Sequence, residues 1–421
     1  MWITISLIVF YVLAPAFLIY ITKHSNFLNR LGAVVLAYLL GLLIGNIGIL
    51  PTASPEFKKL LGTATSLPKT EIQKYLENGQ ITESDLTVNQ IAGIQDTFMT
   101  VIILIAIPLL VFSLDIRKWI NLAKGAVLSM VLAVFSLLLA IFTGYYFLGN
   151  LIPEGWKVSG MLVGVYTGGT PNLAAIGTAL EVNPNIFILT HTYDLIIGSV
   201  CLLFLMTIAQ KVFHIFLPKF QVVHKAENKF HLNDEQDAME NFDPLFKRKS
   251  IPDLLKSFSL SVLIVAIGGG LSMLVPKTAE TMVAVLTITT LGLAASMVKP
   301  INKIRNSFQL GMYLIIIFSL VVSSMANLSN MFQIEFLQLF IFVFWVVFGS
   351  IAIHVGLAAI FKIDADTTII SITALTYSPP FVPPVAGALK NKEIIITGLT
   401  IGILGYAFGT YLGIFVATIL K

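Results

Sequence analysis

The chain has 421 residues, of which 57% are hydrophobic and only 11% are charged, and its formal net charge is +4. Soluble domains carry about 25% charged residues, so this composition cannot build a water-covered surface and excludes a soluble protein. Lysine and arginine are spread over several connections rather than gathered in one patch, which argues against a nucleic-acid partner. The single cysteine, Cys201, excludes a disulfide within the chain.

Apolar runs recur along the whole chain, and each is long enough to cross a hydrocarbon core about 30 Å thick. We predict an all-α integral membrane protein with about ten spanning helices, at residues 3–21, 31–50, 98–114, 126–148, 186–213, 254–275, 281–298, 308–327, 336–361 and 394–420. The first run has no basic segment before it and no small-residue cleavage site, so we expect a retained helix rather than a signal peptide. Two further apolar segments, at residues 158–180 and 367–389, are interrupted by glycine and proline and predict broken helices.

The two halves of the chain repeat one pattern. When the sequence is shifted by 209 residues, the block that starts at Met99 aligns with the block that starts at Phe308. Two helices, a broken segment and a third helix then coincide in order, with Thr167 aligned to Thr376 and Pro171 to Pro380. Internal repeats are common in transporters. We therefore divide the chain into a first membrane repeat (1–213, with a long loop at 46–95), a charged linker (214–253) and a second membrane repeat (254–421).

The positions of lysine and arginine indicate the topology. If both broken segments crossed the membrane fully, the linker would lie opposite Arg117 and Lys118. If each enters and returns on one side, the main basic connections share one face, which the positive-inside rule places in the cytoplasm. This favours re-entrant segments in an inverted five-plus-five repeat, in a bacterial cytoplasmic membrane, with both termini and the 46–95 loop outside. Fully spanning, discontinuous helices are the alternative.

The first broken segment contains the run Val-Tyr-Thr-Gly-Gly-Thr-Pro-Asn at residues 165–172. Gly168 and Gly169 permit a positive φ, Thr170 suits the N-cap of a restarting helix, and Pro171 fits its first turn. Exposed backbone groups at such a break can hold a solute or an ion, although the glycines of a merely kinked helix would look the same. The predicted substrate-binding residues of this segment are Thr167, Gly168, Gly169, Thr170 and Asn172.

The second broken segment is rich in proline, which removes an N–H group and clashes one turn back in a helix. Its predicted helix-breaking residues, with Pro171 of the first segment, are Pro379, Pro380, Pro383 and Pro384. Thr376, Tyr377 and Ser378 carry hydroxyl groups at the break and are predicted to add to the substrate-binding lining. A rigid structural turn is the alternative interpretation.

Ionisable residues within the apolar runs are few, and intramembrane charges mark functional pathways. Thr190, His191 and Asp194 share one helix face, so we predict that they bind the coupling ion. A carboxylate with hydroxyl neighbours suits Na⁺ and could equally carry a proton, while an internally satisfied Asp–His pair is the structural alternative. No cofactor or other metal site is expected beyond a bound Na⁺.

Several motifs are absent from the sequence, and their absence limits the function. The four arginines lie outside the apolar runs, at Arg30, Arg117, Arg248 and Arg305. Because arginine is the usual partner of multiply charged anions, a neutral, zwitterionic or monoanionic solute is expected. There is no Walker loop, HExxH or CxxC motif, so neither an enzyme nor an ATP-driven pump is expected.

The chain resembles a bacterial membrane family, the domain of unknown function 819 (YjcL-like), at residues 165–172 and 377–384. Each of these segments precedes the last helix of its half. The most specific piece is Tyr-Thr-Gly-Gly followed by Asn172. That family is distantly similar to the sodium–glutamate symporters and to the cation/proton-antiporter and anion-transporter superfamily. The resemblance implies an inverted repeat with two re-entrant elements. Gly168 and Gly169 match the glycine-rich motif, whereas the second segment departs from it.

We therefore expect a secondary active transporter that moves a small solute by alternating access, coupled to Na⁺ or H⁺. A cation/proton antiporter without an organic substrate is one alternative. A membrane assembly or signalling subunit, acting through residues 46–95 or 214–253, is another. The expected partners are membrane lipid and a small solute, and the resemblance is compatible with a homodimer.

Overall fold

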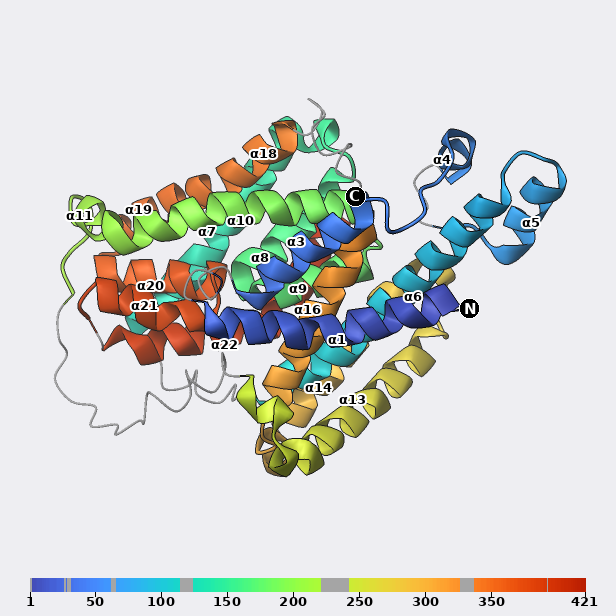
Figure 1. Ribbon diagram of the computed structural model, residues 1–421. Helices are drawn as coiled ribbons and strands as arrows, with labels where there is room; N and C mark the ends of the chain where they lie inside the picture. Colours follow the sequence, from blue (N-terminus) through green and yellow to red (C-terminus); the bar gives the residue numbers. More distant parts are fainter. Residues whose placement is uncertain are drawn as a thin grey trace. The chain divides into compact units, whose positions relative to one another are not determined.

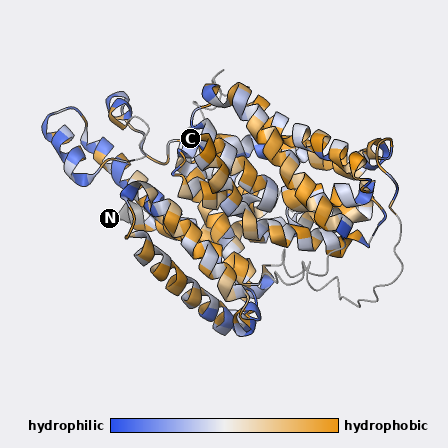
Figure 2. Cartoon of the chain, turned by 180° about the vertical axis from the view of Figure 1, so that it is seen from behind, coloured by the Kyte–Doolittle hydropathy of each residue, from blue (hydrophilic) through white to orange (hydrophobic). Residues whose placement is uncertain are grey.

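The computed structural model describes residues 2–25, 28, 32–61, 66–113, 124–220, 242–325, 337–391 and 393–421. All regular secondary structure in these ranges is helical. Nine of the helices described there are long and apolar enough to cross a membrane. Figure 2 shows the result, with apolar residues along the long helices and polar ones gathered near their ends. The predicted all-α, multi-pass integral membrane fold is confirmed.

The helices of the first part of the chain are α1 (Trp2–His24), α3 (Ala33–Asn46), α4 (Pro55–Leu61), α5 (Lys69–Glu77), α6 (Glu83–Phe112), α7 (Lys124–Leu148), η2 (Gly149–Leu151), α8 (Gly155–Gly168), α9 (Thr170–Ala179), α10 (Pro184–Thr207) and α11 (Ala209–Phe213). The second part contains η3 (Asp243–Phe246), η4 (Arg248–Ser250), α13 (Ile251–Ser272), α14 (Lys277–Ser296), α15 (Lys299–Asn302), α16 (Ser307–Met325), α18 (Leu337–Phe344), the π-helical turn η6 (Trp345–Gly349), α19 (Ser350–Ile360), α20 (Ala365–Thr376), η7 (Pro379–Phe381), α21 (Val382–Ala388) and α22 (Ile394–Leu420). Figure 1 shows the helices coloured along the chain, from blue at the N-terminus to red at the C-terminus.

Two predicted spans differ from the observed helices. The predicted span 31–50 corresponds to α3, which has 14 residues. That is a length of only about 21 Å. The predicted span 98–114 begins much earlier, because α6 starts at Glu83 and has 30 residues. Residues 31, 114, 326–327 and 336 of the predicted spans, residues 62–65 of the predicted loop and residues 221–241 of the predicted linker lie outside the described residues. Arg117 and Lys118, which entered the topology prediction, also lie outside them.

The chain packs as two units. Unit 1 comprises Met1–Ala106, Glu181–Leu189 and Gly311–Gln333, and unit 2 comprises Ile107–Leu180, Thr190–Leu310 and Ile334–Lys421. Both broken segments and the last helix therefore belong to unit 2.

A buried polar network lies within unit 1. The Gln95 side-chain amide donates to the hydroxyl groups of Tyr11 (2.8 Å) and Ser324 (3.0 Å), which are themselves 2.6 Å apart. Gly41 and Gly45 of α3 lie directly against α16, where a Cβ would collide with Ser323 and with the Ser324 backbone. Small residues permit such close helix packing in membranes, and the network satisfies the polar groups that it buries.

The connection between α3 and α6, also in unit 1, is folded rather than an open loop. It has a small apolar core of its own, formed by Phe57, Ile72 and Ile81. The Asp85 carboxylate accepts hydrogen bonds from the backbone N–H groups of Ser54 (2.8 Å) and Thr82 (3.0 Å), which ties the connection to the first turn of α6. Polar residues near the start of α6 are therefore buried against this connection, which is why hydropathy places the helix start too late.

Candidate functional site

The first broken segment is a helical hairpin. Helix α8 ends at Gly168, Gly169 takes φ 74° and ψ −166°, and α9 begins at the next residue. Gly164 lies against the side chain of Ile176, and Gly160 against that of Leu180, so α9 returns along α8. In a continuous helix residues 164 and 176 would be about 18 Å apart. Figure 1 shows α8 and α9 side by side.

The hairpin break differs from the sequence prediction in one detail. The N-cap of α9 is Gly169, and Thr170 is already its first helical residue, so the prediction of Thr170 as the N-cap is wrong. Only glycine reaches a positive φ without strain, and this backbone conformation makes Gly169 the capping residue. Its carbonyl accepts the N–H groups of Asn172 (3.1 Å) and Leu173 (3.2 Å). Pro171 stands in the first turn, as predicted.

The second broken segment also doubles back. Helix α20 ends at Thr376, the backbone turns at Ser378 with φ 73°, and the chain continues through η7 into α21. The two ends of the segment meet, because the Asn391 side-chain amide donates to the Asp366 carboxylate (2.9 Å). The prolines occupy η7, with Pro379 and Pro380, and the first turn of α21, with Pro383 and Pro384, where a missing N–H is tolerated.

The shift of 209 residues extends from the sequence pattern to the backbone. The shift pairs Gly169 (φ 74°) with Ser378 (φ 73°), and Glu181 (φ 51°) with Lys390 (φ 56°). Positive φ values are uncommon for residues other than glycine, so two matched pairs at one shift mark two copies of the same local geometry. Re-entry of each hairpin on one side of the membrane, as opposed to full crossing, stays a prediction.

Helix α22 packs along both hairpins, and its glycines face them in order. These glycines are Gly398, Gly402, Gly405, Gly409 and Gly413. Gly398 lies against α20 and α21, and Gly413 lies against α8 and α9. Gly405, between them, lies against the backbone carbonyl of Thr167 and the side chain of Leu375, near the last residues of α8 and α20. The hairpins therefore extend from opposite ends of α22, and their tips meet near its middle.

The two tips contact each other directly. The Ser378 hydroxyl lies where a side chain on Gly169 would be, so the first hairpin has room only for glycine at this point. Ser378 also lies beside the hydroxyl of Tyr406 on α22. Three elements, α8/α9, α20/α21 and α22, therefore converge at one place.

Two predicted substrate-binding residues turn toward α22. The Asn172 amide donates to the carbonyl of Gly405 (3.3 Å) and its oxygen accepts the Thr410 hydroxyl (3.3 Å). Thr167 is fully buried and donates to the Val163 carbonyl of its own helix (2.7 Å). Asn172 therefore holds the hairpin against α22, and the Thr167 hydroxyl packs against Gly409 of α22. Thr170, Thr376, Tyr377 and Ser378 are half-buried.

The predicted ion-binding residues lie on α10. Thr190 and His191 are buried, and the Asp194 residue is 9% exposed. The His191 Nδ1 and Asp194 Oδ2 atoms are 3.5 Å apart. Among the described residues, no lysine or arginine forms an ion pair with Asp194.

Both hairpin tips contribute a tyrosine beside Asp194. The Tyr377 hydroxyl donates to the carbonyl of Gly198, one turn after Asp194 (2.8 Å). Tyr166, in the last turn of α8, is 4% exposed, and its hydroxyl interacts electrostatically with Asp194 and Tyr377. Cys201 of α10 adjoins the Tyr377 hydroxyl. Sequence reasoning missed Tyr166, although it directly precedes the predicted Thr167.

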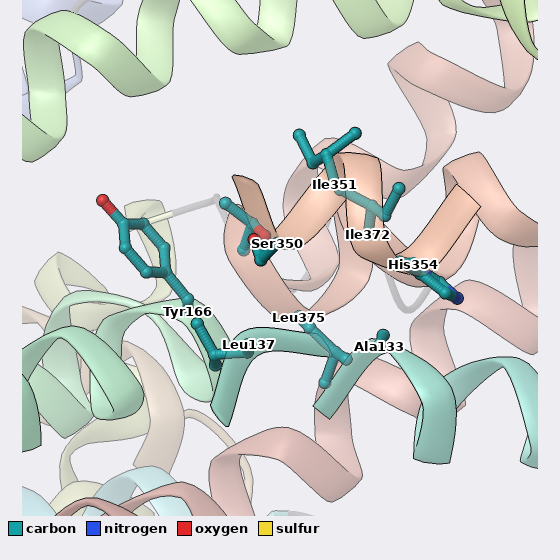
Figure 3. Close-up of a pocket in the computed structure, with 9 residues that line it drawn as sticks. Ala133, Leu137, Tyr166, Ser350, Ile351, His354, Ile372 and Leu375 are labelled. Atoms are coloured by element: carbon teal, nitrogen blue, oxygen red, sulfur yellow. The ribbon is translucent and has the colours of Figure 1, made fainter. Parts of the chain in front are cut away.

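Two small pockets adjoin the tips. One lies among α7, α8, α19 and α20 and is lined by Tyr166, His354 and Thr376, among others. Figure 3 shows Tyr166 at one side of this pocket, with its hydroxyl pointing away from the other labelled residues. The other is lined by Asn172, Tyr406 and residues of α6 and α14. Each has a volume of about 20 Å³, which gives room for a water molecule but not for an organic solute.

The base of the second hairpin is held by a buried carboxylate. Asp366 is 5% exposed and accepts the side-chain amides of Gln210 (2.8 Å) and Asn391 (2.9 Å). We expect Asp366→Ala to lower the free energy of unfolding by about 2–4 kcal/mol, because it leaves two amide donors without their acceptor. Unfolding midpoints in detergent test this, with Asp253→Ala in the first turn of α13 as the control. Equal midpoints for the two variants would contradict the assignment.

These features define a multi-pass, all-α membrane protein with two helical hairpins that meet beside a buried carboxylate. The chain belongs to the family described as "Protein of unknown function (DUF819)", which matches residues 75–421. It is similar to the "Uncharacterized membrane protein YjcL" of Bacillus subtilis (strain 168), with 24% identity over 336 residues, covering 76% of this chain and 82% of that protein. The family resemblance drawn from the Tyr-Thr-Gly-Gly run is therefore confirmed.

Proposed function

We propose that this protein is a secondary active transporter that carries a small solute across the cytoplasmic membrane by alternating access, coupled to Na⁺ or H⁺. The observation that carries the proposal is the meeting of two hairpin tips at the middle of α22, beside the buried Asp194. Non-helical backbone at membrane depth is tolerated only where protein covers it or where it lines a cavity. Broken helices at a midplane site are the arrangement by which transporters bind solutes and ions.

Asp194 is the proposed ion-coupling residue, with Thr190 and His191 beside it. A carboxylate inside a membrane protein is costly unless a cation or a proton compensates its charge. Among the described residues the only ionic partner found for Asp194 is His191, which is charged only when protonated. An exchangeable Na⁺ or proton would supply the missing charge.

The proposed solute site surrounds the tips. Gly168 and Gly169 offer backbone groups there, and Thr170, Thr376, Tyr377 and Ser378 offer half-buried side chains. Asn172 holds the first tip against α22 through its hydrogen bonds, and Thr167 packs against Gly409 of α22. The four arginines of the chain lie outside the apolar runs, which supports a neutral, zwitterionic or monoanionic solute.

A cation/proton antiporter without an organic substrate is the second candidate. The favouring observation is the size of the two pockets, about 20 Å³ each, which suffices for an ion or a water molecule. In either case we place the protein in a bacterial cytoplasmic membrane with both termini outside, surrounded by lipid, with no enzymatic activity and no nucleic-acid partner. A homodimer is compatible with the proposal.

Purified protein in proteoliposomes tests the proposal. An inward Na⁺ or proton gradient is imposed, and uptake of radiolabelled amino acids, monocarboxylates, nucleosides and sugars is measured beside ion flux. We expect at least one solute to accumulate only when a gradient is present. Ion exchange without solute uptake would favour the antiporter instead. If neither solute nor ion moves, a non-transport role for residues 46–95 or 214–253 replaces the proposal.

A further inference from the structure

Tyr166 has a buried hydroxyl group that makes no hydrogen bond of ordinary geometry within the described part of the chain. The residue is 4% exposed, and its hydroxyl faces the Asp194 carboxylate without the geometry of an ordinary hydrogen bond. A buried hydroxyl left unsatisfied costs about 1–3 kcal/mol, so such a group in a native structure calls for a ligand or a role. Its position at the end of α8 places it beside the proposed ion site.

Tyr377 reaches the same place from the other hairpin. Its hydroxyl hydrogen is used by the carbonyl of Gly198 (2.8 Å), which leaves the lone pairs of the phenol oxygen available to accept. Tyr377 interacts electrostatically with Asp194, and so does Tyr166. Oxygen atoms of one carboxylate and two phenols therefore gather where α8, α20 and α10 meet.

We infer that Tyr166 and Tyr377 are ligands of the coupling ion together with Asp194, and that this ion is Na⁺. The inference rests on the proposed function and names its ion and two of its ligands. Na⁺ is a hard cation that needs several oxygen ligands, as hard cations in proteins generally do. A proton bound to Asp194 would need only one hydrogen-bond acceptor, so it would account for one of the two tyrosines and not for both.

The inference also explains how the ion is sensed by both hairpins. Tyr166 belongs to the last turn of α8, and Tyr377 is the C-cap residue of α20. An ion shared by these two residues and Asp194 links each hairpin tip to α10. Loss of the ion removes both links at once, so ion occupancy biases the tips toward the closed arrangement.

Removal of the Tyr166 hydroxyl tests the inference. The Na⁺ dependence of thermal unfolding and ²²Na⁺ binding are measured on purified Tyr166→Phe, with choline replacing Na⁺ in the reference buffer. We expect the Na⁺ concentration for half-maximal stabilisation to rise by about tenfold, since one ligand oxygen is lost. The control is Tyr193→Phe on α10, whose ring centroid lies 5.3 Å from that of Phe340.

The outcomes of this test separate the inference from the proposed function. If Tyr166→Phe binds Na⁺ as tightly as the wild type and Tyr193→Phe do, Tyr166 is not a ligand and the inference is overturned. It is also overturned if no protein responds to Na⁺ while proton-driven uptake in proteoliposomes persists, and the transporter proposal then stands with a proton. Absence of any uptake or ion flux removes the proposed function itself. A wild-type fold in Tyr166→Phe is checked by its unfolding midpoint in choline.

Discussion

We expect Gly405→Ala to lower the free energy of unfolding by about 3 kcal/mol or more. This is at the upper end of the range found for substitutions that overpack a core. The new methyl group would collide with the backbone carbonyl of Thr167 at the end of α8. A backbone atom cannot turn aside as a flexible side chain can, so α8 or α22 must shift as a whole. Unfolding midpoints in detergent measure the loss.

A glycine-to-alanine substitution at an open position of another helix is not expected to lower the free energy of unfolding. At Gly269 of α13, no atom lies within 4 Å of the place that an alanine Cβ would occupy, so Gly269→Ala meets open space. Alanine is favoured over glycine in a helix interior by about 1 kcal/mol, and Gly269→Ala should be neutral or stabilising. Equal destabilisation of the two variants would contradict the packing of α22 against the hairpin tips.

Asp194→Asn is expected to reduce ion-driven solute uptake at least about 100-fold, equivalent to about 2.7 kcal/mol at the transition state. Asparagine keeps the shape of the side chain and removes the charge that holds Na⁺ or a proton. Uptake in proteoliposomes under an ion gradient measures the loss, and the stability of the variant in choline is measured beside it.

The matched control is Asp253→Asn, in the first turn of α13. It removes an equal charge away from the hairpin tips, so uptake should stay at the wild-type level. If Asp194→Asn transports with an unchanged ion dependence, Asp194 has a structural role, in line with the Asp–His pair considered from the sequence.

The sequence was sufficient for the fold class and for both helix breaks. Paired glycines and clustered prolines disrupt helices for local reasons, so residues 165–172 and 377–384 could be located without a structure. The shift of 209 residues also paired Gly169 with Ser378, which share a positive φ. The cap was misplaced by one residue, because Thr170 has the better side chain but Gly169 has the required backbone conformation.

The features that were missed depend on residues far apart in the chain. Asp366 is buried because its amide partners come from Gln210 and Asn391, which no local pattern connects. Tyr166 and Tyr377 meet at Asp194 only because both hairpins pack beside α10. The early start of α6 was hidden because its first turns are polar and become buried by a folded connection rather than by lipid.

Cys201, the only cysteine of the chain, offers the most direct test of alternating access. It is fully buried on α10 beside Tyr377. The rate of its reaction with a membrane-impermeant thiol reagent is measured from each face of oriented proteoliposomes, with and without Na⁺ or a pH step. We expect access from either face, one face at a time, with rates that change with the coupling ion. A rate that is independent of the ion, or access from one face under every condition, would contradict a site at the hairpin tips that opens to both sides.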